Sequence, residues 1–163
     1  MAPSTPFPVR LLVCGERLRG DDGAAPLAVE ALPADVRALA EIVEMGQLSV
    51  EALLDVPASA AVVVADAAVG VAPGRVVTMT LESIAGGAAG AAPAPASSHS
   101  IPPDQVLALA AELRGAAIRG VFVGLGGADF GLGHGLSEPV AAALPSFATA
   151  IAAAIRRLSS DAP

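Results

Sequence analysis

The chain has 163 residues, a formal net charge of −7, only 15 % charged residues and a mean hydropathy of +0.66. Such an apolar composition excludes an intrinsically disordered chain, and the length is that of one ordinary domain. Every basic residue is an arginine, and tyrosine and tryptophan are absent, which excludes the common modes of nucleic-acid binding. The single cysteine, Cys14, excludes a disulfide framework and a thiolate-cluster zinc site.

The chain reads as one domain over residues 1–163, with flexible tails at 1–8 and 159–163. Residues 1–8 carry no apolar core run and are not typical of a signal peptide. The most apolar stretch, Pro139 to Ile155, is rich in alanine and interrupted by Pro145. It therefore predicts a buried amphipathic helix rather than a membrane span, and we expect a monomeric, cytoplasmic protein.

Short apolar runs alternate with helical patterns along the chain. The runs predict strands at residues 9–14, 41–45, 61–65, 75–81 and 120–124. The helical patterns cover residues 24–32, 49–54, 102–114 and 137–158. This alternation predicts an α/β fold, in which a twisted, mostly parallel sheet of about five strands has helices on both faces. The segment from Ser83 to Ser98 reads as the one long loop, a type that is often functional or mobile.

Acidic residues follow two of the predicted strands, at the end of the sheet where α/β proteins bind ligands. The first strand leads through a loop to Asp21 and Asp22, and the third stops directly at Asp66. His99 lies at the end of the long loop, just before a helix. If the two strands are neighbours, two carboxylates and an imidazole could form a nitrogen and oxygen site for nickel, zinc or iron.

Each of these residues also has a simpler interpretation. An aspartate before a helix often caps that helix, and a single loop histidine is often only solvated. Asp66 is the stronger candidate, because burying an unpaired carboxylate is costly. His134, between two glycines, reads as a turn residue, and Cys14 as an inert core thiol.

Four segments share a pattern with one known family. They are Leu12–Gly23 (LVCGERLRGDDG), Val63–Ala67 (VVADA), Ser97–His99 (SSH) and Asp129–Ser137 (DFGLGHGLS). In this order and spacing they resemble the hydrogenase maturation endopeptidases, whose opening pattern is close to G-N-x-L-x-G-D-D-G. The resemblance spans roughly residues 9–158.

The resemblance implies a specific reaction. Members of this family remove a C-terminal extension from the large-subunit precursor of a [NiFe] hydrogenase after nickel has been inserted. Carried over to this chain, the metal-contacting residues are Asp22, Asp66 and His99, with Asp22 and Asp66 also catalytic. The nickel is either bound by the protein itself or supplied by the precursor. Asp21 is then expected to cap the helix or orient the loop.

One departure from the family pattern leaves alternatives open. Glu16 replaces the usual asparagine, and it could join the metal shell or hold Arg17 or Arg19. Both Asp22 and Glu16 are candidates for proton transfer. The altered motif also allows a non-catalytic, nickel-binding checkpoint protein for the same precursor. A third alternative is another metal-dependent peptidase or amidase on the same fold. In the endopeptidase interpretation, the loop from Ser83 to Ser98 closes over the substrate tail.

Overall fold

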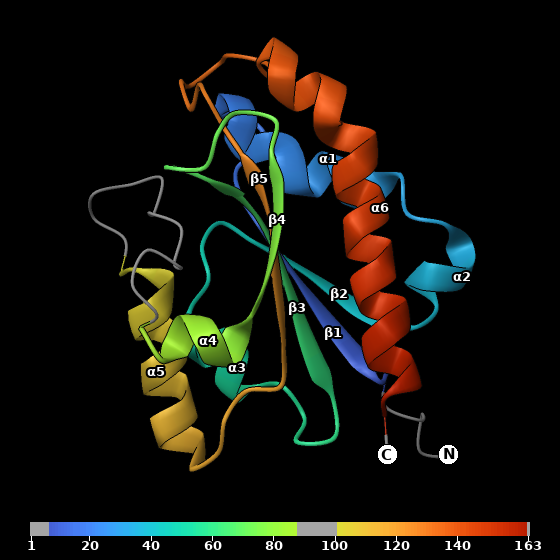
Figure 1. Cartoon of the computed structure of the whole chain (residues 1–163), viewed down its shortest axis with the longest axis vertical. Helices are drawn as coiled ribbons and strands as arrows, with labels where there is room; N and C mark the ends of the chain where they lie inside the picture. Colours follow the sequence, from blue (N-terminus) through green and yellow to red (C-terminus); the bar gives the residue numbers. More distant parts are fainter. Residues whose placement is uncertain (1–6, 88–100, 163) are drawn as a thin grey trace.

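Five strands form one twisted sheet in the order β2-β1-β3-β5-β4 (Figure 1). The computed structural model describes residues 7–87 and 101–162. The strands are β1 (Val9–Cys14), β2 (Ala40–Met45), β3 (Ala61–Ala68), β4 (Val76–Thr80) and β5 (Gly120–Gly126). Strands β1, β2, β3 and β5 are parallel, and β4 runs antiparallel to β5 at the edge. The predicted α/β fold with a mostly parallel sheet is confirmed.

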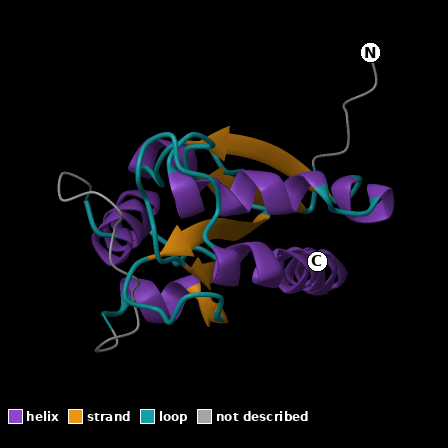
Figure 2. Cartoon of the chain, turned by 90° about the horizontal axis from the view of Figure 1, so that it is seen from above, coloured by secondary structure: helices purple, strands orange, loops and turns teal. Residues whose placement is uncertain are grey.

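Helices cover both faces of this sheet (Figures 1 and 2). The 3-10 turn η1 (Gly20–Gly23) is followed by α1 (Ala24–Glu30), α2 (Ala34–Arg37), α3 (Val50–Leu54), α4 (Leu81–Ala85), α5 (Pro103–Arg114) and α6 (Glu138–Ser160). Helices α1, α2 and α6 contribute to one hydrophobic core, and α3, α4 and α5 contribute to the other. The connections between strands and helices place the loops at the two ends of the sheet.

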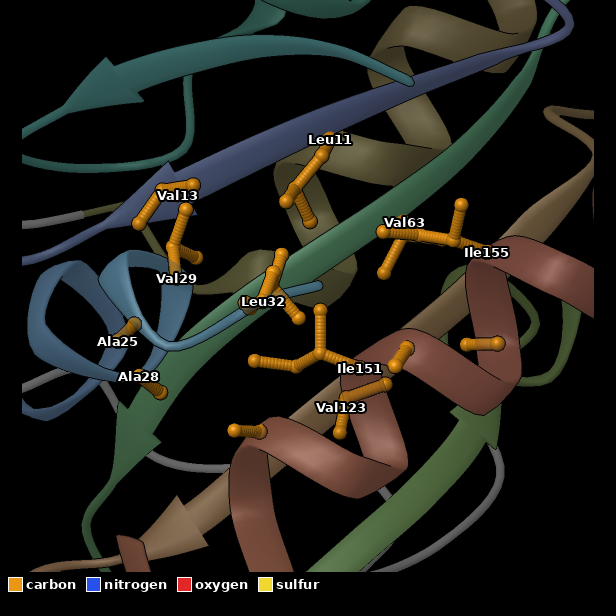
Figure 3. Close-up of a cluster of buried hydrophobic side chains, with 14 of the residues drawn as sticks. Leu11, Val13, Ala25, Ala28, Val29, Leu32, Val63, Val123, Ile151 and Ile155 are labelled. Carbon is orange, nitrogen blue, oxygen red and sulfur yellow. The ribbon is translucent and has the colours of Figure 1, made fainter. Parts of the chain in front are cut away.

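The central strands are apolar along their whole length because the sheet is covered on both sides. Alternate residues point to opposite faces, so Leu11, Val13 and Val63 lie in the core beneath α1 and α6 (Figure 3). Ile151 and Ile155 of α6 are completely buried in the same core. The strand residues that alternate with Leu11, Val13 and Val63, such as Leu12 and Val64, point to the other face and lie in the second core.

Helix α6 has the length and hydropathy of a membrane span over Glu138–Ser160. Its apolar side nevertheless packs on the sheet, where Val140, Phe147 and Ile151 are completely buried. The helix therefore takes part in the core of the domain, as the interrupted, alanine-rich pattern predicted. It continues to Ser160, two residues beyond the predicted end.

Other predicted boundaries were also wrong, and β5 ends at Gly126 rather than at Gly124. Strand β3 does not stop before Asp66 but continues to Ala68, because Asp66–Ala68 pair with Gly124–Gly126 of β5. The predicted loop from Ser83 does not begin there, since Ser83 lies inside α4. The Thr80 hydroxyl caps this helix by accepting a hydrogen bond from the Ser83 N–H at 3.2 Å. The rest of that loop lies outside the described residues from position 88 onward.

The order of the strands places a ligand-binding position beside β1. The chain leaves β1 to form β2 on one side of it, and later returns to form β3 on the other side. In open α/β sheets, ligands bind beyond the carboxyl ends of the strands where this direction changes. The first and third strands are thus neighbours, which was the condition for their acidic residues to meet.

Candidate active site

Asp22 is held at the carboxyl end of β1 by a tightly folded first loop, residues 15–23. Its Oδ2 accepts a hydrogen bond from the Glu16 backbone N–H at 2.8 Å. Gly15 adopts a φ of 130°, and a Cβ atom at this position would lie 2.0 Å from the Asp22 carbonyl oxygen. Only glycine fits both the backbone conformation and this close approach. The loop therefore fixes Asp22 by packing against its main chain.

We expect Gly15→Ala to disrupt the first loop. The added methyl group must push the Asp22 backbone away, in a conformation that L-residues rarely adopt. The expected loss in the free energy of unfolding is about 2–4 kcal/mol, measurable by urea denaturation. Gly135→Ala is the matched control, because a Cβ there has no atom within 4 Å. Equal stability of the two variants would show that the first loop tolerates displacement.

Asp66 is a partly exposed acid inside the otherwise buried strand β3. By strand alternation it points to the same face as Val62 and Val64, the face covered by α3, α4 and α5. Burial, and then the negative charge of Asp22, raise the pKa of Asp66 to about 8, against a smaller opposing effect of the Ala67 N–H. Asp66 therefore keeps its proton at neutral pH.

Asp22 lies in the loop that follows β1, and Asp66 lies on the neighbouring strand β3. The charge of Asp22 contributes to the raised pKa of Asp66, and we refer to the two acids as the carboxylate pair. Burial is also the largest cause of the raised pKa of Asp22. The Glu16 N–H and the charge of Arg19 oppose this rise, and the Glu16 carboxylate adds to it. Two acids in one partly desolvated space cannot both ionise easily, so one of them retains a proton.

Cys14 is the last residue of β1 and is completely buried. Burial, and then the charges of Asp66 and Asp22, raise the pKa of its thiol well above the ordinary value. A thiol in such surroundings stays neutral and is a poor nucleophile. The geometry agrees with the interpretation of Cys14 as a core residue.

His99, the third predicted ligand, lies outside the described residues. The chain becomes described again at Ile101, and α5 begins at Pro103. Within residues 7–87 and 101–162, no group of three or more His, Cys, Asp and Glu side chains could hold a metal ion. The structure thus places Asp22 and Asp66 at the carboxyl ends of neighbouring strands, and the roles of Asp22, Asp66 and His99 as site residues stay predictions.

Asp21 has a different role from Asp22. Its side chain is completely buried and accepts hydrogen bonds from Ala128, Asp129 and Ser137. Asp21 therefore orients a loop, one of the two roles expected for it, rather than capping a helix. Ser137 occupies the N-cap position of α6 as predicted, but its hydroxyl donates to Asp21 instead of capping the helix.

The partners of Arg17 and His134 test two further expectations. Arg17 pairs with Glu30 and Glu44, so Glu16 does not hold it. His134 lies in a turn, with its Nδ1 2.8 Å from Asp129 Oδ2. This position agrees with the prediction of a turn residue.

Comparisons with known proteins identify relatives of this fold. The HycI family model, described as hydrogenase maturation protease, matches residues 27–154. The hydrogenase maturating endopeptidase HybD from E. coli is similar at a TM-score of 0.70 and 24 % identity, covering 91 % of this chain and 92 % of that one. The [NiFe] hydrogenase maturation protease HycI from Thermococcus kodakarensis KOD1 is similar at a TM-score of 0.61 and 21 % identity, covering 94 % and 95 %. Among curated protein sequences, none matches this chain.

The fold is the one seen in hydrogenase maturation endopeptidases. The family match covers most of the chain, including β3 with Asp66. The chain belongs to the hydrogenase maturation protease family, which confirms the family resemblance. The matched residues include three of the four sequence motifs, and the first motif, Leu12–Gly23, precedes them.

Proposed function

We propose that this protein removes the C-terminal extension of a [NiFe]-hydrogenase large-subunit precursor after nickel insertion. The observation that carries the proposal is the carboxylate pair of Asp22 and Asp66, gathered at the switch point of a hydrogenase maturation protease fold. Perturbed acids gathered at such a position are typical of a reaction site. The partner is the precursor itself, whose tail must enter at the carboxyl ends of β1 and β3.

We propose further that Asp22, Asp66 and His99 bind the nickel that the precursor carries. A divalent cation relieves the repulsion between the two carboxylates, and mixed oxygen and nitrogen ligands suit nickel. The high pKa of Asp66 opposes metal binding in the free protein, because a proton must first leave. The retained proton therefore favours the alternative in which nickel arrives with the precursor, rather than the one in which the free protein holds nickel permanently.

Hydrolysis of the peptide bond needs a base for the attacking water and a proton for the leaving amine. In this proposal Asp22 accepts the proton of the water, because the larger rise in pKa falls on Asp66. The water oxygen bonds to the carbonyl carbon, the C–N bond breaks, and the amine leaves with the proton that Asp22 took from the water, so that Asp22 is regenerated. Bound nickel supplies polarisation of the scissile carbonyl.

The departure at Glu16 does not prevent this chemistry. The contact to Asp22 comes from the Glu16 backbone N–H, which asparagine and glutamate both provide. The Glu16 side chain instead points toward Gly46, where a Cβ would lie 2.7 Å from Glu16 Oε1. Exchange of the side chain therefore leaves the hydrogen bond to Asp22 available.

Mass spectrometry of the precursor tests the proposed function. Incubation with this protein should shorten the nickel-loaded precursor by one C-terminal peptide and leave the nickel-free precursor intact. A bound but uncut nickel-loaded precursor would support the checkpoint alternative instead. Cleavage of unrelated peptides without nickel would support a different metal-dependent peptidase.

Nickel binding by the free protein should depend strongly on pH. Below the Asp66 pKa of about 8, each pH unit lower should weaken Ni²⁺ binding by up to about tenfold, because Ni²⁺ competes with one proton. Calorimetric titration with a nickel salt at pH 6, 7 and 8 measures this effect and the protons released. Asp66→Asn should bind more weakly and depend less on pH, because the proton on Asp66 no longer competes with Ni²⁺. Equal affinities of the wild type at all three pH values would contradict the proposal.

A further inference from the structure

We propose that Asp21 is a positioning residue for Asp22, which it serves by clamping the first loop to the glycine-rich loop of residues 127–136 and to the start of α6. This inference rests on the proposed function only for its effect on cleavage. The clamp itself consists of hydrogen bonds between segments that lie more than one hundred residues apart in the chain.

The Asp21 side chain is saturated with donors. Its Oδ2 accepts from the Ala128 N–H at 2.7 Å, the Asp129 N–H at 2.9 Å and the Ser137 hydroxyl at 2.8 Å. Its Oδ1 accepts from the Ser137 N–H at 2.7 Å. Burial raises the pKa of this acid, but the four hydrogen bonds outweigh burial and lower it. Asp21 is thus an ionised, completely buried carboxylate, and its hydrogen-bond partners among the described residues are all uncharged donors.

Main-chain hydrogen bonds join the same two loops beside the carboxylate. The Asp21 N–H donates to the Asp129 carbonyl at 2.7 Å, and the Gly20 N–H donates to the His134 carbonyl at 3.0 Å. A third bond runs the other way, from the Gly133 N–H to the Leu18 carbonyl at 2.8 Å. The first loop is therefore bound along its length to the glycine-rich loop.

The contact between the loops leaves no room for an added side chain at two glycines. Gly20 has a φ of 57°, and a Cβ there would lie 2.3 Å from the Asp129 carbonyl oxygen. A Cβ on Gly127 would lie 2.5 Å from the ring of Phe130 and 3.2 Å from Asp21 Cβ. Displacement of either loop would consequently displace the other.

Asp22 follows Asp21 directly within the η1 turn, so the clamp acts on it through one peptide unit. The Asp22 N–H donates to the Arg19 carbonyl at 3.1 Å, which closes the turn. The Asp22 carboxylate then reaches back to the Glu16 N–H. The Glu16 amide is therefore a direct reporter of where the Asp22 carboxylate lies.

The test replaces Asp21 with asparagine, which preserves size but puts an NH₂ group where one carboxylate oxygen accepted hydrogen bonds. We expect hydrogen exchange of the Glu16 amide to accelerate at least tenfold. We expect kcat for cleavage of the nickel-loaded precursor to fall about a hundredfold with KM within about threefold, because small displacements of a reacting group cost rate rather than binding. Ser137→Ala removes one of the four bonds and should give smaller changes of both quantities in the same direction.

Ile155→Ala is the control for a purely structural effect. It removes a completely buried side chain near the far end of α6, away from the clamp. At a temperature where all variants are folded, it should leave Glu16 exchange and kcat close to the wild type. Glu16 exchange in Asp21→Asn and Ser137→Ala no faster than in Ile155→Ala would overturn the proposal. If the wild type failed to cleave the precursor, the proposed function would fail while the exchange experiment still decided the clamp.

Discussion

Replacing either member of the carboxylate pair should abolish processing of the nickel-loaded precursor. For Asp66→Asn and Asp22→Asn we expect the cleavage rate to fall by at least about a thousandfold, equivalent to about 4 kcal/mol of activation free energy. Asparagine keeps the size of each side chain but can neither accept the proton of the water nor carry the charge that binds nickel. His99→Ala should also lose activity through its proposed contact with the metal. Intact-mass measurement of the precursor over time gives all these rates.

A matched substitution separates this effect from a general loss of carboxylate charge. Asp35 is an exposed acid that pairs with Arg156 at 2.9 Å, and it belongs to α2 rather than to the site. Asp35→Asn should therefore cleave the precursor at the rate of the wild type. Undiminished cleavage by the Asp22, Asp66 and His99 variants together would eliminate the proposed site.

The second large effect is the dependence of stability on pH that Asp66 causes. Replacing Asp66 should lower activity but raise stability at neutral pH. In the unfolded chain Asp66 loses its proton near pH 4, whereas in the folded protein it keeps the proton up to about pH 8. Between these values the unfolded state binds fewer protons, so raising the pH favours unfolding. The slope is at most about 1.4 kcal/mol per pH unit. Because Asp66 is partly exposed, we expect a total loss of about 3 kcal/mol between pH 5 and pH 8.

Asp66→Asn removes this dependence, since its amide does not titrate. The variant should therefore gain stability over the wild type as the pH rises, with little difference at pH 5 and the largest difference at pH 8. Denaturation in urea at three pH values measures the difference, in which the contributions of other groups cancel. A constant difference between variant and wild type would mean that Asp66 titrates normally. A variant that is more stable but inactive would be the signature of a strained functional site.

The sequence predicted the five strands and the helices α1, α3, α5 and α6, but not the short helices α2 and α4. The predicted elements were recognisable because burial leaves a clear pattern. The continuous apolar runs of β1 and β3 are what a sheet covered on both faces requires. Ser49 caps α3 as expected, accepting from the Ala52 N–H at 3.2 Å. The sequence did not show that β1 and β3 are neighbours in the sheet, because strand order depends on the packing of the whole chain.

The site was harder to predict, because its details depend on distant partners. Asp21 and Asp22 are identical neighbours in the sequence, and only the donors at Ala128, Asp129 and Ser137 distinguish them. The end of β3 was misplaced because an acid usually ends a buried strand. Here the strand continues past Asp66, since a protonated carboxyl group can remain beside Gly124 of β5.

The central claim is that Asp22, in the loop after β1, and Asp66, on the neighbouring strand β3, share one small, partly desolvated space. Carbon-13 NMR titration of the Asp66 carboxyl group tests this claim most directly, in the wild type and in Asp22→Asn. We predict a midpoint of about 8 in the wild type and a lower one in the variant, because the charge of Asp22 is then absent. A midpoint near 4, unchanged by the substitution, would show that the two acids are separate and solvated, and would contradict the account.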